Sequence, residues 1–296
     1  MRIAFFGLGK MGIPMVRRLL QGGHKVVGFD LSHGARTRLA HERFVFGETP
    51  EQTAIDADVV ITMLPDEAAV EQVLFGPSGI VKGLRPGALL LEMSTSDANY
   101  IHRCAERLEK LGIRSMDVPV CRGTSEAAQG ELLVLAGGEP DDLAIAMPAL
   151  SLLGKKEDIL HVGPLGTAIR LKLINNYLSM VNMVIAAEGL TFSRLAGIDR
   201  EIAMRVFGST PAGKGQLLTN FPRKVLSGDV SPDFPLKMGL KDITLALKLG
   251  AQLGAPLFAG AAARQAFGLA GPWGRAEEDC TSMLHVLEDM AGLQSA

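Results

Sequence analysis

The hydrophobic pattern divides the chain into two parts. In the first part, short apolar runs rich in Val, Ile and Leu alternate with amphipathic stretches that end near a Gly. This alternation predicts βαβ units and a mainly parallel sheet with helices on both faces. The predicted strands are residues 3–6, 25–30, 59–64, 88–93, 114–118 and 132–136, and the predicted helices between them are residues 15–21, 68–75 and 100–111.

Strand-like runs vanish after about residue 166, and long helical segments punctuated by Gly and Pro follow. This change predicts an α/β chain with a doubly wound Rossmann domain over residues 1–163 and an all-helical domain over residues 164–296. Residues 167–196 contain no Pro and one Gly, so a helix of roughly 45 Å is expected to join the domains. Further helices are predicted at residues 200–207, 236–253, 257–269 and 277–290.

A glycine-rich turn follows the first predicted strand and opens the first helix. Its G-x-G-x-x-G spacing suits a tight turn, a close approach of pyrophosphate to the backbone, and close packing of helix on strand. The N-terminus of the helix adds free N–H groups that favour phosphate. The residues predicted to bind the cofactor here are Gly7, Leu8, Gly9, Lys10, Met11 and Gly12.

Asp30 ends the second predicted strand, about 20 residues beyond the turn. A carboxylate there accepts hydrogen bonds from the ribose hydroxyls of NAD and repels the 2′-phosphate of NADP. Arg36 and Arg38 lie close enough downstream to meet a 2′-phosphate, so the sequence favours NAD without ruling against NADP. Two later strand ends are expected to line the nicotinamide half of the site, namely Met63, Leu64 and Pro65 after one strand and Ser94 and Thr95 after the next.

Polar side chains recur on one face of the long predicted helix. Lys172, Asn175, Asn176 and Ser179 follow the spacing i, i+3, i+4 and i+7, and apolar residues flank them. Because a buried ammonium without a partner is unfavourable, this stripe is expected to face a cleft that binds anions or developing negative charge. A solvated face of a surface helix is the alternative.

Four segments together resemble the β-hydroxyacid dehydrogenase family, which includes 3-hydroxyisobutyrate dehydrogenase and tartronate semialdehyde reductase. They are the glycine-rich turn extended to Met15, the run Asp117-Val118-Pro119-Val120, residues 163–176, and Lys241-Asp242. The resemblance covers almost the whole chain. It implies an active site in a cleft between a Rossmann domain and a helical domain, with Lys241 reaching the cofactor from the second domain. It also implies association through the helical half into a homodimer or homotetramer.

The resemblance and side-chain chemistry together assign catalytic roles. We expect Lys172 to donate a proton to the aldehyde oxygen as hydride arrives from the nicotinamide, and to accept it back in the oxidation of an alcohol. Asn176, one turn further on, is expected to hydrogen-bond the same oxygen or hold the lysine. Asn175 is expected to bind a substrate hydroxyl or neighbouring backbone, and Ser94 to contact the substrate.

One turn departs from the family pattern. Where carboxylate-binding members carry Ser-Gly-Gly, this chain has Cys121-Arg122-Gly123. The planar fork of an Arg suits a carboxylate or a sulfonate, so Arg122, with Gly123 and Thr124, is expected to bind the acid group of the substrate. The alternative is a structural Arg paired with Glu126 or Glu131. Three stretches, residues 117–122, residues 170–177, and residues 212–215 with 224–229, are similar to members that reduce a sulfonated aldehyde.

The expected reaction is thus the NAD-dependent reduction of a short anionic aldehyde or oxidation of the matching hydroxyacid. A sulfonated aldehyde is preferred, and the substrates of tartronate semialdehyde reductase and 3-hydroxyisobutyrate dehydrogenase are the alternatives. Two further functions fit the same architecture. A cofactor-binding regulatory scaffold would lack the lysine on the long helix, and an imine reductase would replace it, so the presence of Lys172 disfavours both.

Composition and charge disfavour several other classes. Lys and Arg number 30 against 32 Asp and Glu, and a formal net charge of -2 gives no basic surplus for nucleic acid. No apolar stretch reaches the ~18 to 20 residues that cross a bilayer, and no signal peptide precedes the first strand, so a cytoplasmic enzyme is expected. The three cysteines are far apart, and neither a disulfide scaffold nor a metal site is expected.

Overall fold

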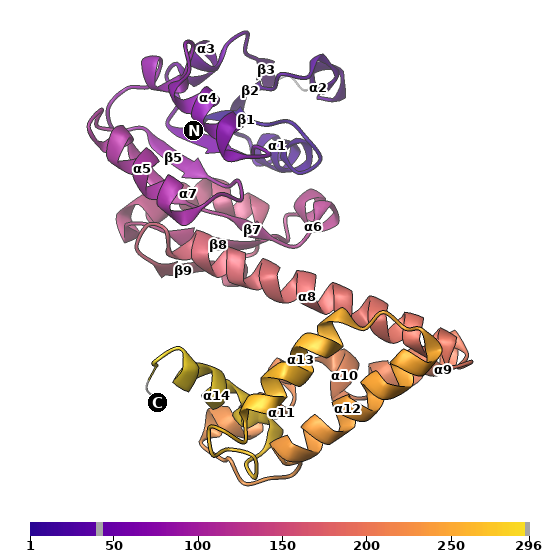
Figure 1. Ribbon diagram of the computed structural model, residues 1–296. Helices are drawn as coiled ribbons and strands as arrows, with labels where there is room; N and C mark the ends of the chain where they lie inside the picture. Colours follow the sequence, from indigo (N-terminus) through magenta and orange to yellow (C-terminus); the bar gives the residue numbers. More distant parts are fainter. Residues whose placement is uncertain (40–43, 294–296) are drawn as a thin grey trace. The chain divides into compact units, whose positions relative to one another are not determined.

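A computed structural model describes residues 1–39 and 44–293 of the chain. It divides into two compact units, Met1–Asn176 and Tyr177–Ala296. The long helix α8 (Thr167–Leu195) begins in the first unit and continues into the second (Figure 1). The boundary between the units therefore lies within this helix, whereas the sequence analysis puts the domain boundary between residues 163 and 164.

The first unit is built on a sheet of nine strands in the order β3-β2-β1-β4-β5-β6-β8-β7, with β9 paired to β8. The first six strands of this order run parallel, as predicted, whereas β8 runs antiparallel to β6 and β7. The strands are β1 (Arg2–Phe6), β2 (Lys25–Phe29), β3 (Phe44–Phe46), β4 (Val59–Thr62), β5 (Leu89–Glu92), β6 (Arg114–Asp117), β7 (Val120–Cys121), β8 (Leu133–Gly137) and β9 (Ile159–Gly163).

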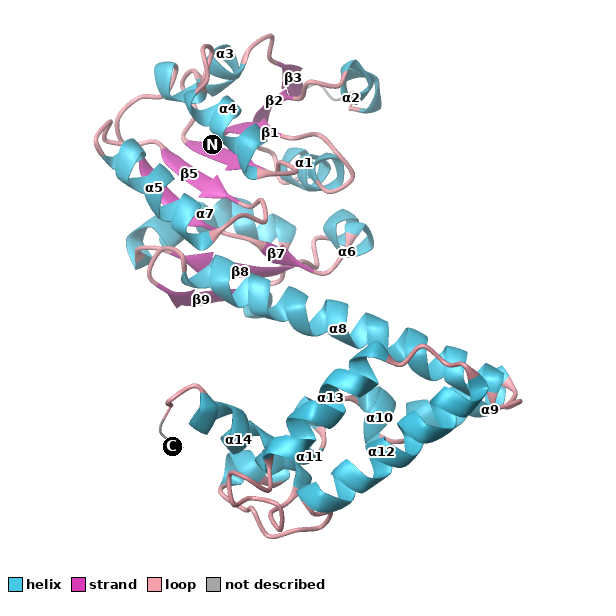
Figure 2. Ribbon diagram, in the orientation of Figure 1, coloured by secondary structure: helices cyan, strands magenta, loops and turns pink. Residues whose placement is uncertain are grey.

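Helices cover both faces of this sheet (Figure 2). Alternate residues of β1 show the two layers, because Ile3 and Phe5 pack with α1 and α7 while Ala4 and Phe6 pack with α4 and α5. The predicted doubly wound fold is confirmed. The helices of this unit before α8 are α1 (Gly12–Gln21), α2 (His33–Arg38), α3 (Pro50–Ala54), α4 (Glu67–Phe75), α5 (Ala98–Glu109), α6 (Thr124–Gln129) and α7 (Pro140–Leu153).

All six predicted strands and all three predicted helices of this half are present, with ends shifted by a few residues. The structure adds β3, β7 and β9 and four helices. Strands β3 and β7 are only three and two residues long, too short for an alternating pattern. Helix α7 begins with Pro140 and contains Pro148. Because Pro inside a sequence usually indicates the end of a helix, the sequence does not predict this one.

Among the residues that the structure describes, the second unit contains helices joined by loops and no strand, apart from one isolated β-bridge. The predicted helix over residues 277–290 is wrong at its start, because α14 begins at Met283. Asp279 accepts hydrogen bonds from the backbone of Thr281, Asp233 and Phe234, which holds this stretch as a loop and a short turn. The helices are α9 (Arg200–Ser209), α10 (Pro211–Lys214), α11 (Asn220–Arg223), α12 (Leu236–Leu253), α13 (Phe258–Leu269) and α14 (Met283–Met290).

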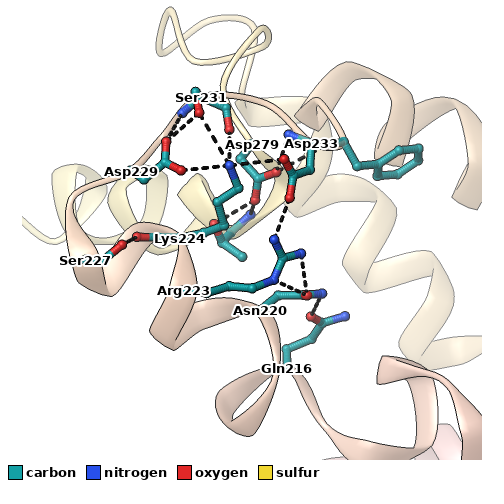
Figure 3. Close-up of polar contacts among 11 residues, drawn as sticks. Gln216, Asn220, Arg223, Lys224, Ser227, Asp229, Ser231, Asp233 and Asp279 are labelled. Atoms are coloured by element: carbon teal, nitrogen blue, oxygen red, sulfur yellow. Dashed lines mark hydrogen bonds and ion pairs between the residues drawn. The ribbon is translucent and has the colours of Figure 1, made fainter.

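A polar network holds the irregular segment between α10 and α12 (Figure 3). The ammonium of Lys224 is buried and donates to the Asp229 carboxylate and the Ser231 carbonyl, each at 2.8 Å. Asp233 lies 3.2 Å from the same nitrogen and also pairs with Arg223. Hydrogen bonds from Lys224 lower the pKa of Asp229, and those from Arg223 and Lys224 lower the pKa of Asp233. A charged cluster, rather than apolar packing alone, therefore orders this segment.

In residues 1–39 and 44–293, no helix combines the length and the hydropathy that a membrane-spanning segment requires. Nor do three or more His, Cys, Asp or Glu side chains in these ranges converge in a way that would hold a metal ion.

Candidate active site

A cavity of about 790 Å³ lies at the carboxyl ends of β1, β2, β4 and β5. These strands are neighbours in the parallel part of the sheet, so the turns that follow them meet at one edge. The cavity unites residues that are far apart in the sequence. Those of the predicted site that line it are Gly7, Gly9, Lys10, Met11, Gly12, Asp30, Met63, Leu64, Pro65, Ser94 and Thr95.

The glycine-rich turn has the shape that a dinucleotide requires. Gly7 has a φ of +98°, and a side chain there would run into the Met63 carbonyl, while one at Gly12 would run into the Gly7 carbonyl. A side chain at Gly9 would meet no atom within 4 Å, so a ligand can approach the backbone there. Helix α1 carries neither a side-chain cap nor an acidic residue in its first turn, which leaves its N-terminal partial positive charge for phosphate.

Asp30 is held at the cavity by two backbone amides. Its Oδ2 accepts a hydrogen bond from the Leu8 N–H and its Oδ1 one from the Ser32 N–H, both at 2.7 Å. Each oxygen retains acceptor capacity for a ribose hydroxyl. The side chain of Leu8 is fully buried. Leu8 therefore contributes to this site through its N–H group, which donates to Asp30. Arg38 donates to the Gly34 carbonyl, and the side chain of Arg36 lies outside what the structure describes.

A buried carboxyl group ties the β4 and β5 turns together. Glu92 accepts hydrogen bonds from the Thr62 hydroxyl at 2.7 Å and from the Ser94 N–H at 2.8 Å. The Ser94 hydroxyl in turn accepts one from the Leu64 N–H at 2.9 Å. Burial raises the pKa of Glu92, and these hydrogen bonds oppose the rise. The sequence analysis missed this residue, since an acid at the end of an apolar run does not reveal that it is buried.

The predicted proton donor lies in the first turns of α8, beside strand β7. The Lys172 Nζ and the Asn175 Nδ2 each lie 3.8 Å from the Sγ of Cys121, which is buried. Asn176 is half-buried one turn from Lys172. The thiol of Cys121 is thus a shared contact of two side chains that the sequence analysis assigns to catalysis and substrate binding.

The start of α8 is fixed by the same stretch of chain. Asp117 is fully buried and accepts hydrogen bonds from the Gly166 N–H at 2.8 Å and the Ile169 N–H at 2.7 Å. Burial raises the pKa of this carboxyl, while the two amides act in the opposite direction. Asp117 at the end of β6 and Cys121 in β7 therefore hold two successive turns of the helix that carries Lys172.

Arg122 follows β7 and has a φ of +73°, a left-handed conformation that few residues other than Gly adopt. Its guanidinium forms an ion pair with Asp158 at 2.6 Å and donates to the Glu131 carbonyl. Of the structural partners considered from the sequence, Glu131 contributes only its backbone. Glu126 instead accepts from the Gly123 N–H at 3.0 Å. Thr124 begins α6.

Lys241 belongs to α12 in the second unit. Its side chain is half exposed, and its Nζ lies 3.1 Å from a carboxylate oxygen of Asp242. A contact of Lys241 with the cofactor stays a prediction.

Two family models match successive parts of the chain. Residues 2–163 match the NAD-binding domain of 6-phosphogluconate dehydrogenase, and residues 166–287 match the model described as the NAD-binding domain of NADP-dependent 3-hydroxyisobutyrate dehydrogenase. The 3-sulfolactaldehyde reductase of Escherichia coli is 38% identical over 98% of this chain and 97% of its own length. The 2-(hydroxymethyl)glutarate dehydrogenase of Eubacterium barkeri is 30% identical over 99% of this chain and 96% of its own length.

Solved structures of similar proteins align with almost the whole chain. The 3-hydroxyisobutyrate dehydrogenase of Mycobacterium tuberculosis, solved with L-serine, aligns over 97% of this chain and 98% of its own with a TM-score of 0.65 and 28% identity. An imine reductase from Myxococcus stipitatus aligns over 97% of this chain and 100% of its own with a TM-score of 0.88, but at 18% identity this similarity shows the fold alone. The chain belongs to the β-hydroxyacid dehydrogenases of the 3-hydroxyisobutyrate dehydrogenase type, a family of NAD-dependent oxidoreductases that act on CH–OH groups.

Proposed function

We propose that this NAD-dependent oxidoreductase reduces a short anionic aldehyde, 3-sulfolactaldehyde, to 2,3-dihydroxypropane-1-sulfonate. One observation carries the proposal. Cys121 contacts Lys172, and the next residue is an Arg that stands in a glycine-like backbone conformation. A candidate proton donor thus contacts the last residue of β7, and a candidate anion-binding group is the residue that follows it.

The side chains of the first unit suit both halves of the chemistry. When bound, the nicotinamide ring supplies hydride for reduction and takes it up in oxidation. The ammonium of Lys172 stabilises negative charge on the carbonyl oxygen and donates a proton to it. In the reverse direction the neutral amine accepts the hydroxyl proton. Asn176 hydrogen-bonds the same oxygen, and Asn175 binds a substrate hydroxyl.

The substrate is inferred from the turn after β7. Arg122 can offer parallel N–H groups to two oxygens of a sulfonate or a carboxylate. The sulfonate is supported by the 38% identity to a protein named 3-sulfolactaldehyde reductase and by the absence of the Ser-Gly-Gly run at residues 121–123. Tartronate semialdehyde and methylmalonate semialdehyde, both carboxylates, are the second candidates.

We also propose that the enzyme acts as a homodimer or homotetramer in the cytoplasm. In the second unit, large apolar side chains of α9 and α12 are exposed, and a second copy of this chain would remove them from water. These side chains are Ile202, Met204, Val206, Leu245 and Leu249. The three cysteines are free thiols, which fits a reducing compartment.

A substrate panel tests the reaction. The purified enzyme is assayed with 3-sulfolactaldehyde, tartronate semialdehyde, methylmalonate semialdehyde and succinate semialdehyde, each with NADH and with NADPH. We expect the highest kcat/KM for 3-sulfolactaldehyde with NADH. A higher kcat/KM for a carboxylate would move the assignment to the second candidates, and no turnover of any anionic aldehyde would overturn it.

A further inference from the structure

The guanidinium of Arg122 is only partly occupied by its protein partners. An Arg has five N–H donors in a fixed planar arrangement. Nη1 uses both of its hydrogens, one for the Glu131 carbonyl and one for Oδ2 of Asp158, each at 2.6 Å. Nη2 uses one, for Oδ1 of Asp158 at 3.1 Å. Asp158 therefore occupies the end of the guanidinium in a bidentate pair.

Two donors remain, the Nε–H and the second N–H of Nη2. Within residues 1–39 and 44–293, neither has a protein hydrogen-bond acceptor. They lie side by side on one edge of the planar group, and their N–H bonds are parallel, which is the arrangement that binds two oxygens of one acid group. The Arg122 side chain as a whole is 40% exposed, so it is not enclosed by the protein.

The surroundings of this edge carry no surplus of positive charge. Arg122 keeps the pKa of Asp158 below its usual range, so Asp158 is ionised at neutral pH. Lys155 is paired with Glu131 at 2.8 Å, and Glu126 adds a third carboxylate near Arg122. The positive charge of Arg122 is already balanced by Asp158. An acid group that binds at the free edge therefore finds no unbalanced positive charge in this ion pair.

We propose that Asp158 determines which acid groups this subsite accepts. Asp158 holds Arg122 so that one edge of the guanidinium stays free. Its negative charge favours the binding of monoanions, a sulfonate or a carboxylate, and weakens the binding of a phosphate dianion. The inference rests on the proposed function, since it assumes that Arg122 binds the acid group of the substrate. Glyceraldehyde 3-phosphate, an aldehyde of similar length, is the dianion that such a site must reject.

The size of the effect follows from Coulomb's law. An acid group at the free edge and the carboxylate at the end of the same guanidinium lie roughly 6 to 7 Å apart, and an effective dielectric constant of about 40 to 80 suits this solvent-exposed site. Each additional negative charge on the ligand then weakens binding by about three- to tenfold. Loss of Arg122 orientation would affect both ligands alike, so the ratio of their kcat/KM values isolates the charge effect.

The test compares 3-sulfolactaldehyde with glyceraldehyde 3-phosphate at pH 7.5, where the phosphate is a dianion. Asp158→Asn is expected to raise the phosphate-to-sulfonate ratio of kcat/KM about three- to tenfold. Asp158→Glu, which keeps the charge, and Glu157→Gln, which removes one charge from the neighbouring residue, are expected to change the ratio less than about twofold. An unchanged ratio in Asp158→Asn overturns the inference.

The wild-type enzyme supplies a second measurement that needs no variant. Lowering the pH from 7.5 to 5.5 converts most of the phosphate to its monoanion, because its second pKa is about 6. The ratio should therefore rise, whereas a ratio independent of pH overturns the inference. The two proposals fail differently. If the wild type reduces no anionic aldehyde, the proposed function is wrong; if it reduces 3-sulfolactaldehyde but both ratios stay constant, only the role of Asp158 is wrong.

Discussion

At the residue scale, the proposed chemistry depends on the ammonium of Lys172. We expect Lys172→Ala to lower kcat by about 10²- to 10⁴-fold, the usual contribution of a general acid. Stopped-flow and steady-state assays with 3-sulfolactaldehyde measure this loss. NADH binding, followed by fluorescence titration, should change less than about twofold, because the cavity that fits the cofactor does not include Lys172. Near-normal turnover in a folded Lys172→Ala enzyme would refute its role.

Asp30 is expected to set the choice of cofactor. Backbone amides hold its two oxygens at the edge of the cavity where we expect the adenosine ribose to bind. In Asp30→Ser, KM for NADH should rise about ten- to hundredfold, since a charge-assisted hydrogen bond is worth ~1.5 to 3 kcal/mol, and the preference over NADPH should shrink. Asp66→Ser, at the N-cap of α4, is the matched control. Equal loss for both cofactors would argue against discrimination at Asp30.

Sequence spacing predicted the glycine-rich turn, Asp30 and the Lys172 stripe because local chain geometry suffices to place them. It did not reveal the partner of Arg122. Asp158 follows it by 36 positions and reaches it because β7 and β9 both pair with β8. The sequence analysis looked for a partner among the nearer residues Glu126 and Glu131, and tertiary structure selected a more distant acid.

At the scale of elements, the position of α8 depends on Asp117, whose carboxylate accepts hydrogen bonds from backbone N–H groups at the start of the helix. In Asp117→Ala, the Gly166 and Ile169 N–H groups stay buried without an acceptor, and each costs about 1 to 3 kcal/mol of unfolding free energy. Urea unfolding measures the loss. Asp117→Asn, which keeps one acceptor oxygen, should lose less, and kcat should fall in Asp117→Ala because Lys172 loses its fixed register. An unaltered urea midpoint in Asp117→Ala would contradict this anchoring.

The polar network of the second unit predicts a dependence of stability on pH. Asp229 and Asp233 have lowered pKa values, so they bind protons less readily in the folded chain than in the unfolded chain. Their contribution to stability is present above the unfolded pKa of about 3.9 and is lost as the pH falls through the lower folded values. Asp229→Asn should flatten this acid limb of the Tm profile recorded between pH 5 and 2. A profile as steep as that of the wild type would exclude the network as its cause.

Elements with a strong local pattern were predictable, and those defined by their neighbours were not. None of the five residues of β9 is fully buried, and the strand is defined by its pairing with β8. The residues of α14 were assigned too early a start, because the capping role of Asp279 depends on backbone groups more than forty positions away.

At the scale of the whole molecule, the apolar side chains of α9 and α12 predict self-association. Light scattering should give at least twice the 31.5 kDa mass of one chain. Ile202→Asp together with Leu245→Asp should shift the enzyme toward a monomer, because two charges would be buried without partners. The matched control is Leu31→Asp, an exposed apolar residue of the first unit. A monomeric wild type at micromolar concentration would contradict this assembly.

The left-handed backbone of Arg122 implies a trade-off between the stability of the turn and the selectivity for acidic substrates. A glycine would adopt this conformation without strain, so Arg122→Gly relaxes the turn even as it removes the group proposed to hold the acid end of the substrate. An ancestor with glycine at this position would gain an anion receptor through one codon change and accept a strained turn in exchange. Selection for a broader range of aldehyde substrates would favour the reverse change, from Arg to Gly.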